Sequence, residues 1–190
     1  MTTSRNNKKN MIIHVATRLF NQHNYDAVSM NQIATEVGIT KAALYYHFQN
    51  KHELFFHSID TSTDIFISEI QSVVTTESLT LHERIKKLVL VHIHFILNHH
   101  GFMNYLHQKS QHDETILTLI QQKRKQIADI MEPLCKQIIT TKKMTGTISP
   151  TEITNAIMGL TKGMLCEQPL NTPTNNPEHI ATKITTILLS

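Results

Sequence analysis

TKAALYYHFQNKHEL, residues 40–54, sets two tyrosines and a histidine in a row between two lysines. On a helix that turns about 100° per residue, Leu44 and Phe48 fall on one face, and Ala42 and Tyr46 fall on the opposite face. Tyrosines on the outer face of a short helix contribute little to a core, but their hydroxyl groups and flat rings suit phosphates, sugars and thymine methyl groups. The stretch therefore predicts a short helix with one buried face and one contact face.

A second short helix is predicted immediately before this one. Ser29, three residues before Gln32, forms a capping box that predicts a helix over residues 30–37. Gly38 ends this helix, and Thr40 caps the next one. Two helices of about eight residues joined by a short turn have the dimensions of a helix-turn-helix. A plain helical hairpin with incidental surface tyrosines is the alternative.

The rest of the chain shows helical periodicity of its apolar residues almost throughout. With only 5 Gly and 5 Pro in 190 residues, long helices are favoured over a many-turned β-sandwich. We expect Asn24 to end the first helix in a left-handed conformation, Gly101 to interrupt the chain between two helices, and Pro133 to kink a long helix. The fold class is therefore all-α with about nine helices, the later ones at residues 51–73, 80–99, 102–110, 113–142, 150–166 and 177–190.

Short motifs in the helix-turn-helix and its flanks occur together: Ala16-x-x-Leu19-Phe20, Tyr25, Ser29, Ile33-Ala34, Val37-Gly38-Ile39-Thr40, Leu44-Tyr45-Tyr46-His47-Phe48 and Lys51-x-Glu53-Leu54. In this combination the segment from about Met11 to Phe55, roughly a quarter of the chain, resembles the DNA-binding domain of TetR/AcrR-family transcriptional regulators. One departure is Asn24, where the family usually has glycine. The resemblance implies a helix-turn-helix domain at residues 1–55 and an effector-binding and dimerisation domain at residues 56–190.

The same resemblance implies which side chains contact DNA: Thr40, Lys41, Ala42, Tyr45, Tyr46, His47 and Lys51. We expect Thr40, Tyr46 and Lys51 to hold phosphates. The base edges would then face Lys41, Ala42 and Tyr45. For His47, packing against its neighbours is an equally good interpretation.

The charge distribution agrees with a polyanionic partner. Residues 1–58 contain 6 basic and 3 acidic side chains, whereas residues 59–190 contain 12 of each, so the whole excess of +3 lies in the first third. A single helix-turn-helix makes too few contacts for a specific site, so we expect a homodimer that reads a palindromic operator in double-stranded DNA.

Small residues in the penultimate helix support the dimer. Ala156, Gly159 and Gly163 recur at helical spacing, and a glycine inside a helix costs about 1 kcal/mol relative to alanine, so a packing reason is expected. The last helix offers Ile180, Ile184 and Ile187 as a partner stripe. The family's usual dimer, implied by the resemblance, is a four-helix bundle of these two helices from each subunit. The alternative is a weakened helix end near Gly163.

The resemblance also implies a third partner, a small effector that we expect to be apolar, and its pocket is harder to place. Six large side chains of the middle helices could line an apolar cavity or simply form core: Phe95, Phe102, Met103, Tyr105, Leu106 and Met131. Of the 13 histidines, no two are four residues apart on a helix, so we expect neither a metal site nor a cofactor.

Other classes of protein are disfavoured. The sequence has no GxSxG, Walker or dinucleotide motif, so we expect no enzyme activity. No signal-peptide pattern or membrane-spanning apolar run is present, and the two cysteines form no CxxC pair, so we expect a cytoplasmic protein. With these classes disfavoured, the resemblance implies a transcriptional repressor that is released from its operator by a small molecule. The alternative is a helical small-molecule-binding dimer that binds no operator.

Overall fold

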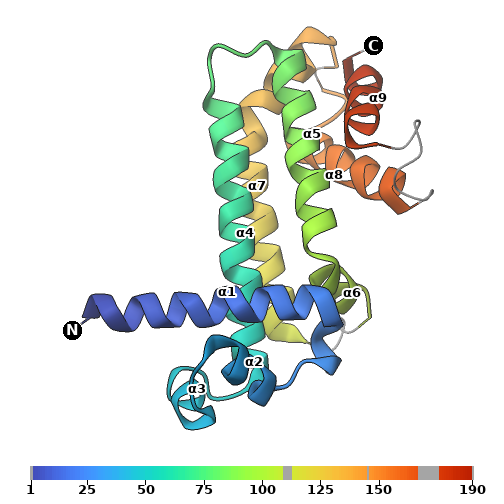
Figure 1. The fold of residues 1–190 in the computed structure, drawn as a ribbon. Helices are drawn as coiled ribbons and strands as arrows, with labels where there is room; N and C mark the ends of the chain where they lie inside the picture. The colour runs from blue at the N-terminus through green and yellow to red at the C-terminus, as the bar shows by residue number, and fades with distance from the viewer. Residues whose placement is uncertain (1, 109–112, 145, 167–175, 190) are drawn as a thin grey trace. The chain divides into compact units, whose positions relative to one another are not determined.

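The computed structural model describes residues 2–108, 113–144, 146–166 and 176–189, and within these ranges the chain forms helices and no strand (Figure 1). The helices are α1 (Thr2–Ala27), α2 (Met30–Val37), α3 (Lys41–His47), α4 (Lys51–Thr75), α5 (Leu81–Asn98), α6 (His100–Gln108), α7 (Glu114–Thr141), α8 (Pro150–Cys166) and α9 (Pro177–Leu189). The predicted all-α fold is confirmed. None of the described helices has the length and apolar character needed to cross a membrane.

The chain divides into two compact units that interleave along the sequence. Unit 1 comprises Met1–Asp64 and Asn98–Ile120, and unit 2 comprises Ile65–Leu97 and Gln121–Ser190. Helices α4 and α7 each contribute residues to both units. The functional boundary at residue 55 stays a prediction, because compactness does not report which residues contact a ligand or DNA.

Helices α1 and α6 of unit 1 pack closely at Gly101. A Cβ atom on Gly101 would lie 1.9 Å from the carbonyl oxygen of Phe20 and 2.9 Å from the Cα of Asn21. Only glycine permits this close approach of two backbones. The expectation that Gly101 interrupts the helices is therefore wrong: α6 begins at His100 and includes Gly101, since the glycine serves the packing against α1.

Aromatic rings fill the core of unit 1. The Phe55 ring of α4 lies 5.0 Å from the Phe20 ring of α1, and 5.5 Å and 4.6 Å from the rings of Phe102 and Tyr105 on α6, measured between centroids. Tyr25 completes the cluster, 4.7 Å from Phe55. This cluster joins the helix that precedes the helix-turn-helix to the helix that follows it.

Asn24 has an unusual backbone within α1. Its φ of 63° is positive, as predicted, but its ψ of 163° lies outside the left-handed helical region. This extended conformation bends the chain inside α1. The Asn24 side chain accepts a hydrogen bond from Asn104 Nδ2 of α6 at 3.0 Å, which adds a second tie between α1 and α6.

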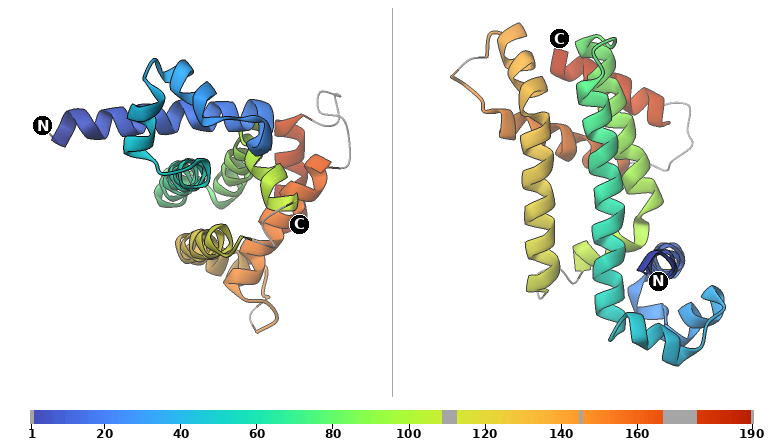
Figure 2. Two further views of the ribbon diagram at one scale, coloured as in Figure 1. Left: turned by 90° about the horizontal axis from the view of Figure 1, so that it is seen from below. Right: turned by 90° about the vertical axis from the view of Figure 1, so that its left-hand side faces the viewer.

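Unit 2 has its own apolar core, formed by parts of α4, α5 and α7 together with α8 and α9. Figure 2 shows α9 beside α5, where Lys86 and Glu178 form an ion pair of 2.9 Å at the surface. Ile85 of α5 and Ile184 of α9 are fully buried in this core. Pro133 lies inside α7, which continues beyond it to Thr141.

Candidate functional site

Helices α2 and α3 are held by the caps that the sequence predicted. Ser29 Oγ accepts a hydrogen bond of 3.1 Å from the Gln32 amide, and Thr40 Oγ1 accepts one of 3.1 Å from the Ala43 amide. Between them Gly38 takes the left-handed conformation, with φ 73° and ψ 38°. These interactions confirm the predicted capping and fix the angle at which α3 leaves α2.

Helix α3 has one buried and one exposed face. Leu44 and Phe48 are fully buried, whereas Tyr45 and Tyr46 are 43% and 67% exposed. Lys41 and Ala42 are also exposed, and Lys41 Nζ lies 5.9 Å from the centroid of the Tyr45 ring. The predicted division of faces is confirmed, while contact of the outer face with DNA stays a prediction. We call the exposed side chains of Lys41, Ala42, Tyr45 and Tyr46 the α3 face.

The helix-turn-helix has an ion pair at its first helix and two hydrogen bonds directly after its second helix. Arg18 of α1 pairs with Glu36 of α2 at 2.6 Å. After α3, Asn50 Oδ1 accepts a bond of 2.8 Å from the Glu53 amide, and Glu53 Oε2 accepts one of 2.6 Å from the Gln49 amide. These contacts tie α2 to α1 and cap the start of α4, on either side of the α3 face.

Lys51 has a structural role that sequence analysis missed. Its Nζ donates hydrogen bonds to the carbonyl oxygens of Tyr25 at 2.9 Å and Asp26 at 3.5 Å, and it lies 4.3 Å from the Tyr25 ring centroid. It thereby satisfies carbonyl groups at the end of α1. A lysine in the first turn of a helix opposes the helix dipole, and this was the available signal that its ammonium group serves another element. Its predicted phosphate contact stays a prediction.

His47 and Thr40 complete the predicted DNA-contacting set. His47 is partly buried, and its ring centroid lies 5.4 Å from that of Tyr46 in an edge-to-face arrangement. Thr40 is exposed and uses its hydroxyl oxygen for the cap. The packing of His47 against Tyr46 agrees with a role in positioning the Tyr46 ring. A direct contact of His47 with DNA stays a prediction.

A polar cluster that includes the hydroxyl group of Tyr105 connects helices α4, α6 and α7 of unit 1. His52 Nε2 lies 2.7 Å from Asp113 Oδ2, to which the Tyr105 hydroxyl donates at 2.6 Å, and Asp113 Oδ1 caps α7 at the Ile116 amide at 3.1 Å. Burial alone would raise the pKa of Asp113, but these hydrogen bonds outweigh it and lower that pKa. Burial and the Asp113 carboxylate raise the pKa of Tyr105.

The six side chains predicted for the effector pocket do not come together. Phe102 and Tyr105 are buried in the core of unit 1, where Leu106 packs against them, and Met103 is partly buried on the same helix. Phe95 and Met131 belong to unit 2, where the Phe95 ring stacks on Phe66 at 4.4 Å between centroids. For Phe102 and Tyr105, the alternative of plain core is the better description, because both pack against Phe55.

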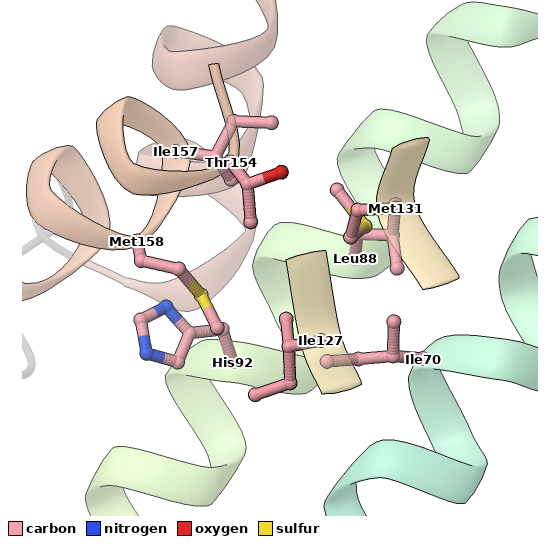
Figure 3. Close-up of a pocket in the computed structure, with 8 residues that line it drawn as sticks. All are labelled: Ile70, Leu88, His92, Ile127, Met131, Thr154, Ile157 and Met158. Carbon is pink, nitrogen blue, oxygen red and sulfur yellow. The ribbon is translucent and has the colours of Figure 1, made fainter. Parts of the chain in front are cut away.

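Unit 2 contains a pocket lined by four of its helices (Figure 3). Of the predicted residues only Met131 lines it, and the full lining is Ile70, Leu88, His92, Ile127, Met131, Thr154, Ile157 and Met158. Burial lowers the pKa of His92 to about 4. His92 follows Leu88 by four residues on the apolar face of α5, a spacing that could have identified it as partly buried. In the described part of the chain, no group of three or more His, Cys, Asp or Glu side chains could hold a metal ion.

The residues predicted for the dimer interface separate into two groups. Ala156, Gly159 and Gly163 are exposed on α8, and a Cβ atom on either glycine would meet no atom of the described residues within 4 Å. Ile180 and Ile184 are instead 2% and 0% exposed and belong to the core of their own chain, so they have no free surface for a partner. Ile187, in contrast, is 56% exposed. The candidate interface is thus narrowed to Ala156, Gly159, Gly163 and Ile187, which we call the α8–α9 outer face.

Sequence comparison places the helix-turn-helix in a known group. Residues 12–57 match the sequence model of the family described as "Bacterial regulatory proteins, tetR family". IcaR of Staphylococcus epidermidis, an HTH-type negative transcriptional regulator of the biofilm operon icaADBC, is 39% identical over 59 residues. That stretch is 31% of this chain and 32% of IcaR, so the chain matches about a third of the length of this curated relative.

Solved structures resemble the chain over nearly its whole length. A TetR/AcrR-family regulator from Thermobifida fusca has a TM-score of 0.73 at 23% identity, covering 96% of this chain and 97% of that one. AibR, solved in complex with isovaleryl coenzyme A and operator DNA, has a TM-score of 0.72 at 23% identity, covering 96% of this chain and 98% of its own. At these identities the likeness establishes the fold.

Proposed function

We propose that the chain, whose helix-turn-helix matches the tetR family, is a sequence-specific DNA-binding repressor of the TetR/AcrR family, released from its operator by a small apolar effector. It would act in the cytoplasm as a homodimer. The proposed activity is that of a regulator, without catalysis.

The observation that carries the proposal is the α3 face. Two exposed tyrosines, a lysine and a small alanine are presented by a helix whose inner residues are fully buried and whose N-terminus is capped. Side chains on a fixed scaffold lose little freedom when they bind, so their contacts contribute more to affinity. A lysine can reach a guanine edge or a phosphate, and tyrosine can donate to phosphate oxygens.

The α3 face is small, and this limits how much DNA one subunit can contact. The four side chains of one α3 face contact too little DNA for a specific site, and two-fold dimers solve this by reading two half-sites about one helical turn apart. The α8–α9 outer face supports such a dimer, because Gly159 and Gly163 leave space for a second helix to approach closely. The operator would then be palindromic.

The effector would act through α4. The pocket of unit 2 includes Ile70 on this helix, and the same helix carries Leu54 and Phe55 into the core of unit 1. A ligand that displaces Ile70 would therefore shift α4. Because Leu54 and Phe55 of α4 pack in the core of unit 1 together with residues of α2 and α3, this shift would change the position of the helix-turn-helix. AibR, which shares the fold, is a protein solved with both a coenzyme A thioester and operator DNA.

Binding of genomic DNA fragments tests the proposal. The full chain should retain a small set of fragments that share a two-fold symmetric sequence. Tyr46→Ala and Lys41→Ala should each weaken binding about tenfold or more, because they remove contacts from the α3 face. Lys125→Ala, which removes an exposed lysine of α7, serves as the control for lost charge. A chain that binds all fragments equally, or none, would instead be a ligand-binding dimer without an operator.

A further inference from the structure

A residue that lines the pocket of unit 2 has a buried polar atom that the described chain leaves without a hydrogen bond. His92 Nδ1 is out of contact with solvent and has no partner among the described residues. Figure 3 shows the imidazole beside the Met158 side chain, at one end of the pocket. The centroid of the His92 ring lies 5.7 Å from that of the Phe66 ring. Buried donors and acceptors without a partner are rare, because each costs free energy.

The electrostatic character of the pocket restricts what could supply the partner. None of the eight lining residues carries a charge at pH 7, since the lowered pKa of His92 keeps the imidazole neutral. A carboxylate or phosphate placed here would lose its hydration without a cation to compensate it. A neutral imidazole has one donor and one acceptor nitrogen, and a hydroxyl or amide group can pair with either.

We propose that this pocket binds a neutral, mostly apolar molecule through one hydroxyl or amide group that hydrogen-bonds to His92 Nδ1. The apolar part of the ligand lies among Ile127, Met131 and Ile157. That this molecule is the effector rests on the proposed function. The proposal goes beyond that function by naming the chemical class of the ligand and the residue that selects it.

Ligand entry requires side chains to move. The free space at the centre of the pocket is about 10 Å³, room for about one water molecule. Met131 and Met158 line this space, and methionine changes rotamer more readily than branched residues do. We expect rotation of these two methionine side chains to open the space that a small ring needs.

A matched series of probes tests the ligand class on the full chain. Phenol carries a hydroxyl group, benzene has the same ring without it, and benzoate carries a negative charge. Methyl-labelled methionine NMR follows occupancy at Met131 and Met158. His92→Phe keeps a ring against Phe66 but removes the nitrogen, and His94→Phe, at an exposed position of the same helix, is the matched control. Thermal unfolding establishes that both variants are folded.

We expect phenol to shift the two methyl resonances and to bind roughly three- to tenfold more weakly to His92→Phe, the loss of one net hydrogen bond. Benzene should bind the variant at least as well as the wild type, benzoate should leave both resonances unmoved, and His94→Phe should match the wild type. The inference is overturned if benzoate binds as tightly as phenol, if His92→Phe leaves phenol affinity unchanged, or if no probe reaches the pocket because water alone fills it.

These outcomes are separate from those of DNA binding. If phenol binds through His92 but no DNA fragment is retained, the proposed function fails and the ligand site stands. If fragments are retained but phenol does not bind, the inference fails and the regulator stands.

Discussion

At the residue scale, Asn24 has a backbone that suits glycine better than any other residue. Its combination of φ 63° and ψ 163° costs an L-residue about 1–3 kcal/mol. We therefore expect Asn24→Gly to raise the free energy of unfolding by about 1 kcal/mol, even though the exposed hydrogen bond from Asn104 is lost. Urea unfolding measures this change.

The control for Asn24 is alanine. Asn24→Ala loses the same hydrogen bond but keeps the strain, so it should be less stable than the wild type. If glycine and alanine lowered stability equally, the strain at this position would contribute nothing.

His92 predicts a pH dependence of stability. In the unfolded chain a histidine binds a proton near pH 6.5, whereas burial lowers the pKa of His92 to about 4 in the folded chain. Between these values the unfolded state binds more protons, so stability falls as the pH falls. Going from pH 7 to pH 5 should cost about 2 kcal/mol through this residue.

Urea unfolding at both pH values checks this expectation. His92→Phe should remove the loss of stability on acidification, whereas His94→Gln, at an exposed position, should keep it. An unchanged pH dependence in His92→Phe would mean that the imidazole is solvated in the folded chain.

Single residues were predicted well where only helical phase mattered. Leu44, Phe48, Tyr45 and Tyr46 lie on the faces that the 100° rotation assigns to them. The structural role of Lys51 and the pocket position of His92 were not predicted, because the residues around them lie on other helices. The Tyr25 carbonyl is 26 residues from Lys51 in the sequence, and only folding brings the two together.

At the scale of elements, the crossing of α1 and α6 depends on Gly101. A methyl group there would lie 1.9 Å from a backbone oxygen, so the two helices must separate to admit it. We expect Gly101→Ala to lower the free energy of unfolding by about 3 kcal/mol, at the upper end of overpacking costs. His100→Ala, at the exposed preceding position, should change it little, and equal stability of the two variants would contradict the close crossing.

Lys41 and Lys51 should differ in what their removal changes. Lys41→Ala removes an exposed charge from the α3 face, so the slope of log affinity for DNA against log salt should fall by about one without loss of stability. Lys51→Ala should lower the free energy of unfolding by about 1 kcal/mol, because carbonyl groups of α1 lose their donor. Titrations at several salt concentrations and urea unfolding separate the two effects, and a Lys41 variant with an unchanged slope would exclude its contact with DNA.

Helix boundaries could be predicted within a few residues because capping side chains lie beside the helices they cap. Ser29, Thr40 and Asn50 each accept a hydrogen bond from an amide three residues later. Gly101 was misjudged because the same local rules treat an internal glycine as a break. The reason for a glycine at this position is the Phe20 carbonyl group, which leaves no room for a side chain and belongs to another helix.

At the scale of the whole molecule, the α8–α9 outer face should hold two subunits together. Gly159→Leu places a large side chain where close helix packing is proposed, and its Cβ would meet no described residue within 4 Å. We expect sedimentation to show a shift from dimer to monomer with the helical content unchanged. Thr182→Leu, at an exposed position of α9, is a control for added apolar surface, and a dimer of unchanged strength in Gly159→Leu would exclude this face.

The sequence could not define the pocket, because its lining comes from four helices. Large apolar side chains at helical spacing look alike whether they line a cavity or fill a core, and Phe102 and Tyr105 proved to be core. The predicted isoleucine stripe of the last helix was ambiguous for the same reason, since Ile180 and Ile184 face their own chain.

The most direct test of the account is sequencing of the genomic fragments that the full chain retains at physiological salt, in parallel with Tyr46→Ala. The account predicts that the wild type enriches one short two-fold symmetric sequence and that Tyr46→Ala loses this enrichment. Retention of no fragment above background, or the same enrichment by both proteins, would contradict it.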